Sequence, residues 1–319
     1  MKRKTIDTTL VLINPLKEVD PLKQAKKEKT RRIVRLVIIY AFLTIAALIC
    51  VFPFYYMIAA SGMSQNDITA GKMVPDFATL LDNLATNYSE TFTRINYLKH
   101  VGNTLLIAFT ITVFQVLTTI LAAFAFARLE FKGREVLFIA FLATMMVPGE
   151  LLAITNYTTL SNIGLTGLDQ NAFQAFLAVV LPLIASAFYI YLLRQNFKQI
   201  PNELYLAAKM DGTSDWKYLW KVMVPIAMPT LITITVLSII GQWNNYVWPS
   251  LVVYDDEFTM ISVIIRKGYL TLQGQDGGPV VQYGWQMTAS VLTVVPLLIL
   301  FIIFRKYIMR GTSRAGIKG

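Results

Sequence analysis

The sequence has few of the residues from which enzyme sites and metal centres are usually built. It contains one cysteine, Cys50, and one histidine, His100, among 319 residues. A disulfide within the chain and a metal site made of several cysteines or histidines are therefore excluded. Gly71-Lys72 is followed by Met73, and no Gly-x-x-x-x-Gly-Lys-Ser/Thr segment occurs. The chain therefore lacks a P-loop for ATP.

Charge is also scarce. Charged residues make up 15% of the chain and hydrophobic residues 55%, whereas an ordinary soluble domain has roughly 25% charged residues. A soluble fold of this composition would expose large apolar patches. Disorder is excluded because the apolar content is too high. The composition therefore indicates a membrane protein.

Six apolar stretches reach the roughly 20 residues that a helix needs to cross the hydrocarbon core. They are residues 36–60, 101–127, 136–160, 171–193, 222–254 and 277–304, and Glu150 is the only charged residue in them. The first is longer than a signal-peptide core, so we expect a retained span. Backbone groups in lipid must bond within the protein. The sequence therefore predicts an all-α polytopic membrane protein with six transmembrane helices.

The distribution of Lys and Arg predicts the orientation. Alternate sides of the six spans hold 24 and 5 of the 29 Lys and Arg residues. Both termini and the loops 128–135 and 194–221 are therefore expected in the cytoplasm. The net charge of +10 reflects this asymmetry, together with contact to anionic lipid, so no nucleic-acid partner is expected.

We expect three parts. Residues 1–35 form a basic cytoplasmic arm, 36–305 a six-helix transmembrane domain with a cytoplasmic loop at 195–224, and 306–319 a cytoplasmic tail. Residues 23–35 fit either a basic helix on the inner leaflet or a solvated arm. Prolines within or at the ends of spans predict kinks whose freed carbonyls face a cavity; they are Pro53, Pro148, Pro182, Pro225, Pro229, Pro249 and Pro296.

The cytoplasmic loop predicts two helices joined by a turn. Asn202 suits the cap of the first helix, and Gly212 suits the left-handed position after it. A second helix is expected to start at Thr213 or Ser214. Its apolar residues follow helical spacing and predict an aromatic face; they are Trp216, Leu219, Trp220 and Met223. Either a connector resting on the bilayer or a docking knob for a cytoplasmic partner fits this pattern.

This loop resembles the signature of permease subunits in binding-protein-dependent ABC importers. That signature is Glu-Ala-Ala, three residues, Gly, nine residues, Ile-x-Leu-Pro, and matching positions hold Ala207, Ala208, Gly212, Val222, Val224 and Pro225. Leu206 occupies the position of the signature Glu, and Glu203 lies one turn earlier. Glu203, Leu204 and Asp211 resemble the carbohydrate branch. The stretch 241–249 and the C-terminal end also resemble sugar permeases, the latter the second permease subunit of maltose-type transporters.

The resemblance covers most of residues 36–319 and implies a type I ABC importer permease fold in a prokaryotic cytoplasmic membrane. It implies four partners: a second permease subunit, a cytoplasmic ATPase dimer that binds ATP and Mg, an extracytoplasmic solute-binding protein and a sugar. The chain itself is expected to bind no cofactor and no metal. The ATPase-coupling residues would be Glu203, Leu206, Ala207, Ala208, Asp211, Gly212 and Pro225.

Two further groups are candidates for contact with the solute or the binding protein. Amides and aromatic rings suit sugars, and they gather at Gln242, Trp243, Asn244, Asn245, Tyr246 and Trp248, with Gln115 as a more distant candidate. The same cluster also fits helix–helix packing or an interfacial aromatic belt. By resemblance, the loop that contacts the binding protein would include Gln273, Gly274, Gln275, Asp276, Gly277 and Gly278. A plain flexible connector is the alternative.

Other classes of membrane protein fit less well. A permease for glycerol phosphate is the nearest alternative to a sugar permease. An ion-coupled transporter would have ionisable residues within its spans, and only Glu150 qualifies. Pro148 and Gly149 before it suggest a helix break with solvent access. A membrane-embedded hydrolase would need a nucleophile beside a base. The chain has a single His and a single Cys, so few such pairs are possible.

Overall fold

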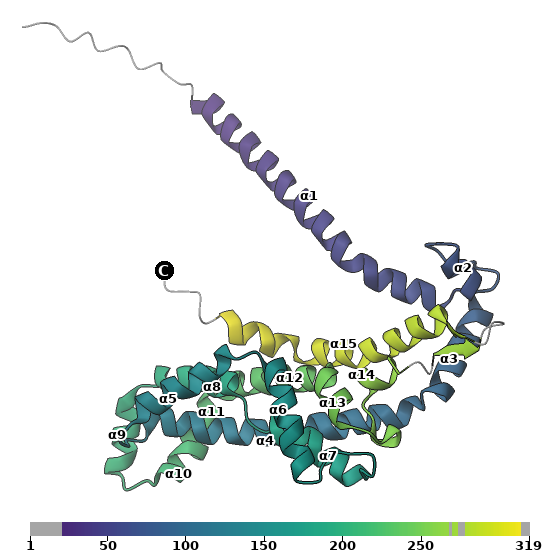
Figure 1. Ribbon diagram of the computed structural model, residues 1–319. Coiled ribbons are helices and arrows are strands. Elements are labelled where there is room, and N and C mark those ends of the chain that lie inside the picture. The colour runs from purple at the N-terminus through teal and green to yellow at the C-terminus, as the bar shows by residue number, and fades with distance from the viewer. Residues whose placement is uncertain (1–20, 268–269, 274–277, 314–319) are drawn as a thin grey trace, which may run out of the picture. The chain divides into compact units, whose positions relative to one another are not determined.

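The computed structural model describes residues 21–267, 270–273 and 278–313, and these are almost entirely helical (Figure 1). The elements are α1 (Pro21–Ser61), α2 (Gln65–Thr69), α3 (Leu80–Arg94), α4 (Tyr97–Arg128), α5 (Arg134–Ala143), η1 (Thr144–Met146), α6 (Gly149–Asn162), α7 (Ala172–Val180), η2 (Leu181–Leu183), α8 (Ala187–Gln199), α9 (Asn202–Met210), α10 (Asp215–Tyr218), the π-helical turn η3 (Leu219–Met223), α11 (Val224–Ile226), α12 (Met228–Trp243), α13 (Val247–Val252), η4 (Asp256–Phe258), α14 (Ile261–Ile264), β1 (Thr271–Gln273), β2 (Pro279–Val281) and α15 (Tyr283–Ser313). The chain divides into two compact units, Met1–Tyr56 and Met57–Gly319.

The predicted helical fold is confirmed, and the strands within the described ranges form one short hairpin. Strands β1 and β2 pair antiparallel, with Thr271 opposite Val281 and Leu272 opposite Val280. Sequence patterning favoured a glycine-rich connector here, because three-residue strands carry too little alternation to be recognised.

Three helical stretches are long and apolar enough to cross a membrane unbroken: Lys29–Ser61, Tyr97–Arg128 and Tyr283–Lys306. Three further candidate spans are bent helix pairs. The bends are 98° between Arg134–Met146 and Gly149–Asn162, 46° between Ala172–Leu183 and Ala187–Gln199, and 79° between Asp215–Ile226 and Met228–Trp243. Two predicted boundaries fall inside helices, because α1 continues through residue 35 and α15 continues past residue 305.

Prolines accompany all three bends, as the sequence predicted. Pro148 precedes α6, Pro182 lies in η2, and Pro225 and Pro229 lie on either side of the bend between α11 and α12. Proline fixes φ and removes a backbone donor, which stops a helix. Pro53, in contrast, lies within the continuous α1.

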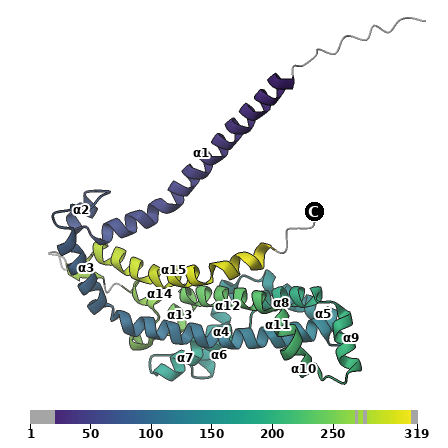
Figure 2. The same ribbon diagram turned by 180° about the vertical axis from the view of Figure 1, so that it is seen from behind.

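Helix α4 is the centre of the second unit, where it packs against α8 and α12. In Figures 1 and 2 it runs from the end that holds α3 to the end that holds α9 and α10. Small residues on its buried face, Ala108, Ala123 and Ala127, allow the close helix approach that is typical of membrane bundles. Its other face exposes Leu105, Phe109 and further large apolar side chains. We call the two ends of this unit the α3 end and the α9 end.

Polar side chains on α4 cover the break between α7 and α8. The break frees the carbonyls of Leu183 and Ile184. Gln115 donates to the Leu183 carbonyl at 2.7 Å, and Thr118 donates to the Ile184 carbonyl at 2.8 Å. Ser238 on α12 in turn donates to the Gln115 side-chain carbonyl at 2.7 Å. These two carbonyls were expected to face a cavity; they bond to a neighbouring helix instead.

At the α3 end, Asn87 joins three helices. Its side-chain amide donates to the carbonyls of Ser61 and Met63, at 2.9 and 3.1 Å. A Cβ atom built on Gly284, at the start of α15, would lie 2.9 Å from this amide. Glycine is therefore required for α15 to approach α3 this closely.

Replacing Gln115 with Met should lower the thermal stability of the protein in detergent. The substitution keeps the side-chain volume but leaves the Leu183 carbonyl without its side-chain donor. An unsatisfied buried polar group costs about 1–3 kcal/mol. Gln199 is exposed on α8, so Gln199→Met is the matched control and should leave the melting temperature unchanged. Equal melting temperatures for Gln115→Met and wild type would show that the break needs no cap.

Candidate functional site

The predicted pair of helices joined by a turn is present at the α9 end. Helix α9 ends at Met210, and Gly212 follows with φ of 70°. The turn is closed by a 2.9 Å hydrogen bond from Thr213 N–H to the Ala208 carbonyl. Ser214 then caps α10 by accepting a hydrogen bond from Lys217 N–H. The prediction that Gly212 takes a left-handed conformation and that Ser214 begins the second helix is therefore confirmed.

One local prediction is wrong. Asn202 is not the cap of α9; Pro201 holds that position, and the Asn202 side chain accepts a hydrogen bond from Arg128 at 3.0 Å.

The predicted apolar residues of the second helix differ in exposure. Leu219 and Met223 are buried, together with Tyr218. Trp220 is half-buried, and 63% of Trp216 is exposed.

Side chains between α9 and α10 hold the two helices together. Tyr205 donates a 2.7 Å hydrogen bond to the Asp215 carboxylate, and Lys209 pairs with the same carboxylate at 2.7 Å. The hydrogen bond to Asp215 raises the pKa of Lys209. The rings of Tyr205 and Tyr218 lie 5.1 Å apart. Helices α9 and α10 thus form one structural block, which we call the α9–α10 block.

Arg128, the last residue of α4, attaches this block to the bundle. Its guanidinium donates to the carbonyls of Phe197 and Ile200, at and just beyond the end of α8, and to the Asn202 side chain. The carbonyls at a helix C-terminus lack intrahelical partners and favour a cation. This explains how Arg128 is buried without a carboxylate partner among the described residues. Movement of the α9–α10 block is thereby linked to α4 and α8.

A second arginine, Arg194 on α8, reinforces the same end. It donates to the Phe126 carbonyl at 3.1 Å and pairs with Glu135 at 3.0 Å. Its guanidinium also lies 3.6 Å from the centre of the Phe138 ring. Neither arginine was predicted as a functional residue. In the sequence, each arginine directly follows a long apolar stretch, and this position could have indicated its role.

Most of the residues predicted to couple to an ATPase lie on the surface. Those exposed are Glu203, Leu206, Ala207, Asp211, Gly212 and Pro225. Ala208 is half-buried against the core. Around them, 55% of Leu206 and 88% of Met210 are exposed. Leu206 and Met210 lie one turn apart on α9 and expose apolar surface there, and Trp216 exposes more on α10.

The residues predicted to line a solute path separate into two sets. The indole N–H groups of Trp243 and Trp248 donate to the carbonyls of Thr293 and Val179, at 3.2 and 3.3 Å. Both indoles are buried, as is Gln115, the cap described above. These three side chains pack helices together in this chain.

The second set lies at or next to the break between α12 and α13. Asn244 is exposed, Asn245 and Tyr246 are half-buried, and Gln242 is buried beside them. Asn245 donates to the Gln242 side-chain carbonyl at 3.4 Å. Amide groups and an aromatic ring thus gather at a helix end rather than along one helix face.

The remaining predicted sites are only partly described. Gln273 ends β1 and Gly278 precedes β2, while residues 274–277 lie outside the described residues. Glu150 is exposed in the first turn of α6 after the predicted break. Within the described ranges, no three His, Cys, Asp or Glu side chains come together as a metal site.

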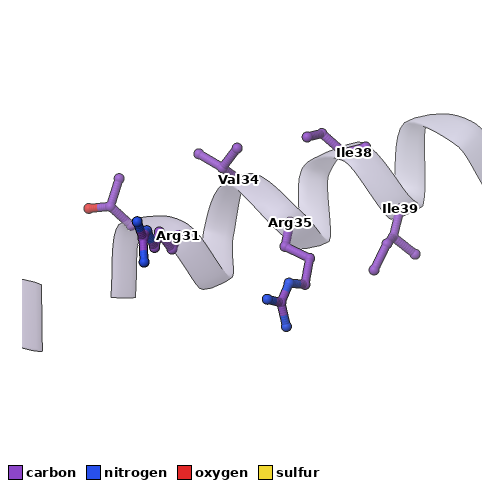
Figure 3. Close-up of a pocket in the computed structure, with 6 residues that line it drawn as sticks. Arg31, Val34, Arg35, Ile38 and Ile39 are labelled. Atoms are coloured by element: carbon purple, nitrogen blue, oxygen red, sulfur yellow. The ribbon is translucent and has the colours of Figure 1, made fainter. Parts of the chain in front are cut away.

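A shallow groove lies on α1 (Figure 3). It is lined by Thr30, Arg31, Val34, Arg35, Ile38 and Ile39. All six come from successive turns of one helix, so the groove encloses no volume in which to hold a solute. Arg31 and Arg35 lie one turn apart at the start of the apolar segment, a position in which basic side chains meet anionic headgroups.

The helices define a class of protein, a multi-pass membrane bundle with a rigidly attached helix pair at one end. The chain belongs to the family of binding-protein-dependent transport system inner membrane components, whose model matches residues 115–314. It is 30% identical to the arabinooligosaccharides transport system permease protein AraQ of Halalkalibacterium halodurans, covering 92% of this chain and 100% of the relative. It is also 30% identical to the trehalose/maltose transport system permease protein MalG of Thermococcus litoralis, covering 92% and 99%.

A solved structure agrees with this fold. The chain matches a bacterial ABC transporter involved in the import of the acidic polysaccharide alginate, with a TM-score of 0.71 and 23% identity. The match covers 87% of this chain and 97% of the other. At this identity the likeness concerns the fold.

Replacing Arg128 with Lys should loosen the α9–α10 block. An ammonium is a point charge and cannot reach the three acceptors that the guanidinium fork reaches. A hydrogen bond to a charged group contributes about 1.5–3 kcal/mol, so the amides of α9 should exchange hydrogen at least about tenfold faster.

The matched control for this experiment is Arg94→Lys. Arg94 forms an exposed ion pair with Glu90 at the α3 end, where such pairs contribute little. Unchanged exchange in α9 of the Arg128→Lys variant would contradict the role of Arg128.

Proposed function

We propose that the chain is the membrane-spanning permease subunit of an ATP-driven sugar importer in a prokaryotic cytoplasmic membrane. Family membership supports the permease role. The relatives named for arabinooligosaccharides and for trehalose and maltose support a sugar substrate. Glycerol phosphate is the alternative solute class.

The proposed topology has six spans, with each bent pair counted as one, and both termini in the cytoplasm. The distribution of positive residues supports this orientation. Arg128 ends α4, Arg194 lies on α8 and Lys209 on α9, and the loops predicted to be cytoplasmic hold most of the Lys and Arg residues. Positive residues favour the cytoplasmic side.

The observation that carries the proposal is the exposed α9–α10 block held by Arg128. A permease without an ATP site must receive energy from a partner. The exposed faces of Leu206, Ala207 and Met210 offer a contact surface, and the bonds of Arg128 link that surface to α4 and α8. Rigid elements that move as a body are a common way of transmitting such a change. An ATPase dimer would thus act on the path through this block.

The exchange of the signature carboxylate for Leu206 affects how the partner is bound. Glu203 lies on the same helix and is exposed, so it can supply a charge one turn away. With Leu206 and Met210 exposed beside it, we propose that the contact is largely apolar. A second permease subunit, an extracytoplasmic solute-binding protein and the segment 273–278 as its contact complete the proposed assembly.

The proposed solute path passes the break between α12 and α13. Asn244, Asn245 and Tyr246 offer amides and a ring, which together suit hydroxyl groups and sugar ring faces. The buried Gln115, Trp243 and Trp248 support this region from behind, through bonds to backbone carbonyls.

Replacing Gly212 with Val should uncouple ATP hydrolysis from sugar uptake. A β-branched residue at φ of 70° is strained, by about 1–3 kcal/mol, and the turn between α9 and α10 must shift. In vesicles that contain the complete transporter, uptake should fall at least about tenfold while membrane insertion is unchanged.

The control is Gly71→Val, because Gly71 has nearly the same φ, 74°, and is equally open. It lies in the segment between α2 and α3, far in sequence from the block. Normal uptake by the Gly212→Val transporter, with normal binding of the ATPase, would count against the coupling role.

A further inference from the structure

The segments that join α1 to α4 and α12 to α15, with the first turn of α4, hold five basic residues, and four have a carboxylate partner. Lys72 pairs with Asp67 at 2.6 Å, Arg94 with Glu90 at 2.8 Å and Lys99 with Glu257 at 2.6 Å. Lys267 pairs with Asp256. The fifth is Arg266, and no carboxylate among the described residues pairs with it.

Arg266 instead lies against the proposed solute path. Its guanidinium carbon is 4.2 Å from the centre of the Tyr246 ring. A guanidinium that stacks on a ring keeps its N–H donors free at its edge. Because Arg266 is exposed and Tyr246 half-buried, these donors are available to a bound molecule. The stack fixes the guanidinium without neutralising it.

The surrounding structure holds this pair in place. Ser262 on α14 donates a 2.6 Å hydrogen bond to the Asn245 carbonyl in the break. Trp243 packs in one cluster with Ile261 and Ile264 of α14. The turn that carries Arg266 therefore keeps a fixed position beside Asn244, Asn245 and Tyr246.

The other end of this segment is anchored to α4. The Thr259 carbonyl lies 2.7 Å from Nδ1 of His100, and Ile261 N–H donates to the Thr104 hydroxyl at 2.9 Å. The hydrogen bond from Lys99 lowers the pKa of Glu257, which keeps that carboxylate charged and paired. Asp256 and Glu257, on the same segment, are thus engaged with lysines, and no carboxylate within the described ranges compensates Arg266.

We propose that Arg266 binds an anionic group of the transported saccharide, either a carboxylate or a phosphate. The guanidinium fork fits both groups in two-pronged geometry. The Tyr246 ring and the amides of Asn244 and Asn245 contact the sugar rings and hydroxyl groups beside it. This inference rests on the proposed function, since it assigns the substrate class of the same site.

The experiment uses the complete transporter in proteoliposomes, with its binding protein and internal ATP. Three probes are compared: maltotriose as a neutral sugar, trigalacturonate as a carboxylate-bearing sugar and sn-glycerol 3-phosphate as a phosphate-bearing solute. Wild type should import at least one acidic probe better than maltotriose. Import of trigalacturonate would identify the bound group as a carboxylate, and import of sn-glycerol 3-phosphate would identify it as a phosphate.

Two variants are then compared with wild type. Arg266→Gln should lower the uptake of the acidic probe at least tenfold and leave the stimulation of ATP hydrolysis by the binding protein unchanged. Lys267→Gln is the control, because the neighbouring charge is already paired with Asp256, and it should change uptake less than twofold.

Several outcomes overturn the inference. If wild type imports maltotriose alone, the inference is wrong, but the proposed function as a sugar importer still holds. A loss of ATPase stimulation in Arg266→Gln, with all probes affected equally, assigns the arginine to binding-protein contact. Unchanged uptake in Arg266→Gln excludes a role in selection. If wild type imports none of the three probes, the proposed function fails first and the inference with it.

Discussion

The burial of one guanidinium at a helix end is the constraint on which the α9 end depends. Arg128 is placed among carbonyls that the end of α8 leaves without partners. Both sides of this arrangement would be costly alone, because buried charges and orphan carbonyls each need a partner. Three hydrogen bonds join them, two to the carbonyls and one to Asn202, the first residue of α9, while Nε of Arg128 has no partner among the described residues. A long apolar helix thereby ends in a polar joint.

The interior of the bundle follows the same logic. Several of its polar side chains bond to backbone carbonyls of neighbouring helices, some of them beside a break in a helix. Gln115 and Thr118 bond to carbonyls freed beside Pro182, and the indoles of Trp243 and Trp248 bond to carbonyls of other helices. In a bilayer, water cannot satisfy such groups. A polar residue in a span is therefore as well explained by a broken helix nearby as by a solute.

These interactions determine which features of the structure could be predicted from the sequence. Run length, proline and the Lys/Arg distribution predicted the candidate spans and the bends beside Pro148 and Pro182, since these signals are local. Gly212 was predictable because its conformation is a backbone requirement. The roles of Asn202 and Gln115 were not, because both depend on a partner far away in sequence. The exposure of Trp216 was not predictable either, because helical spacing shows which residues share a face but not which face is buried.

The π-helical turn η3, Leu219–Met223, limits which insertions and deletions this segment can accept. Each helical residue turns the chain by about 100° and advances it by about 1.5 Å. A turn with one additional residue therefore sets the angle at which α11 and α12 leave the exposed block. Gain or loss of a single residue here would rotate the rest of the span and present a different face to its neighbours. Hybrid permeases assembled from two relatives are accordingly best joined in the hairpin around Gly133, where the chain is exposed and the length of a loop is free to change.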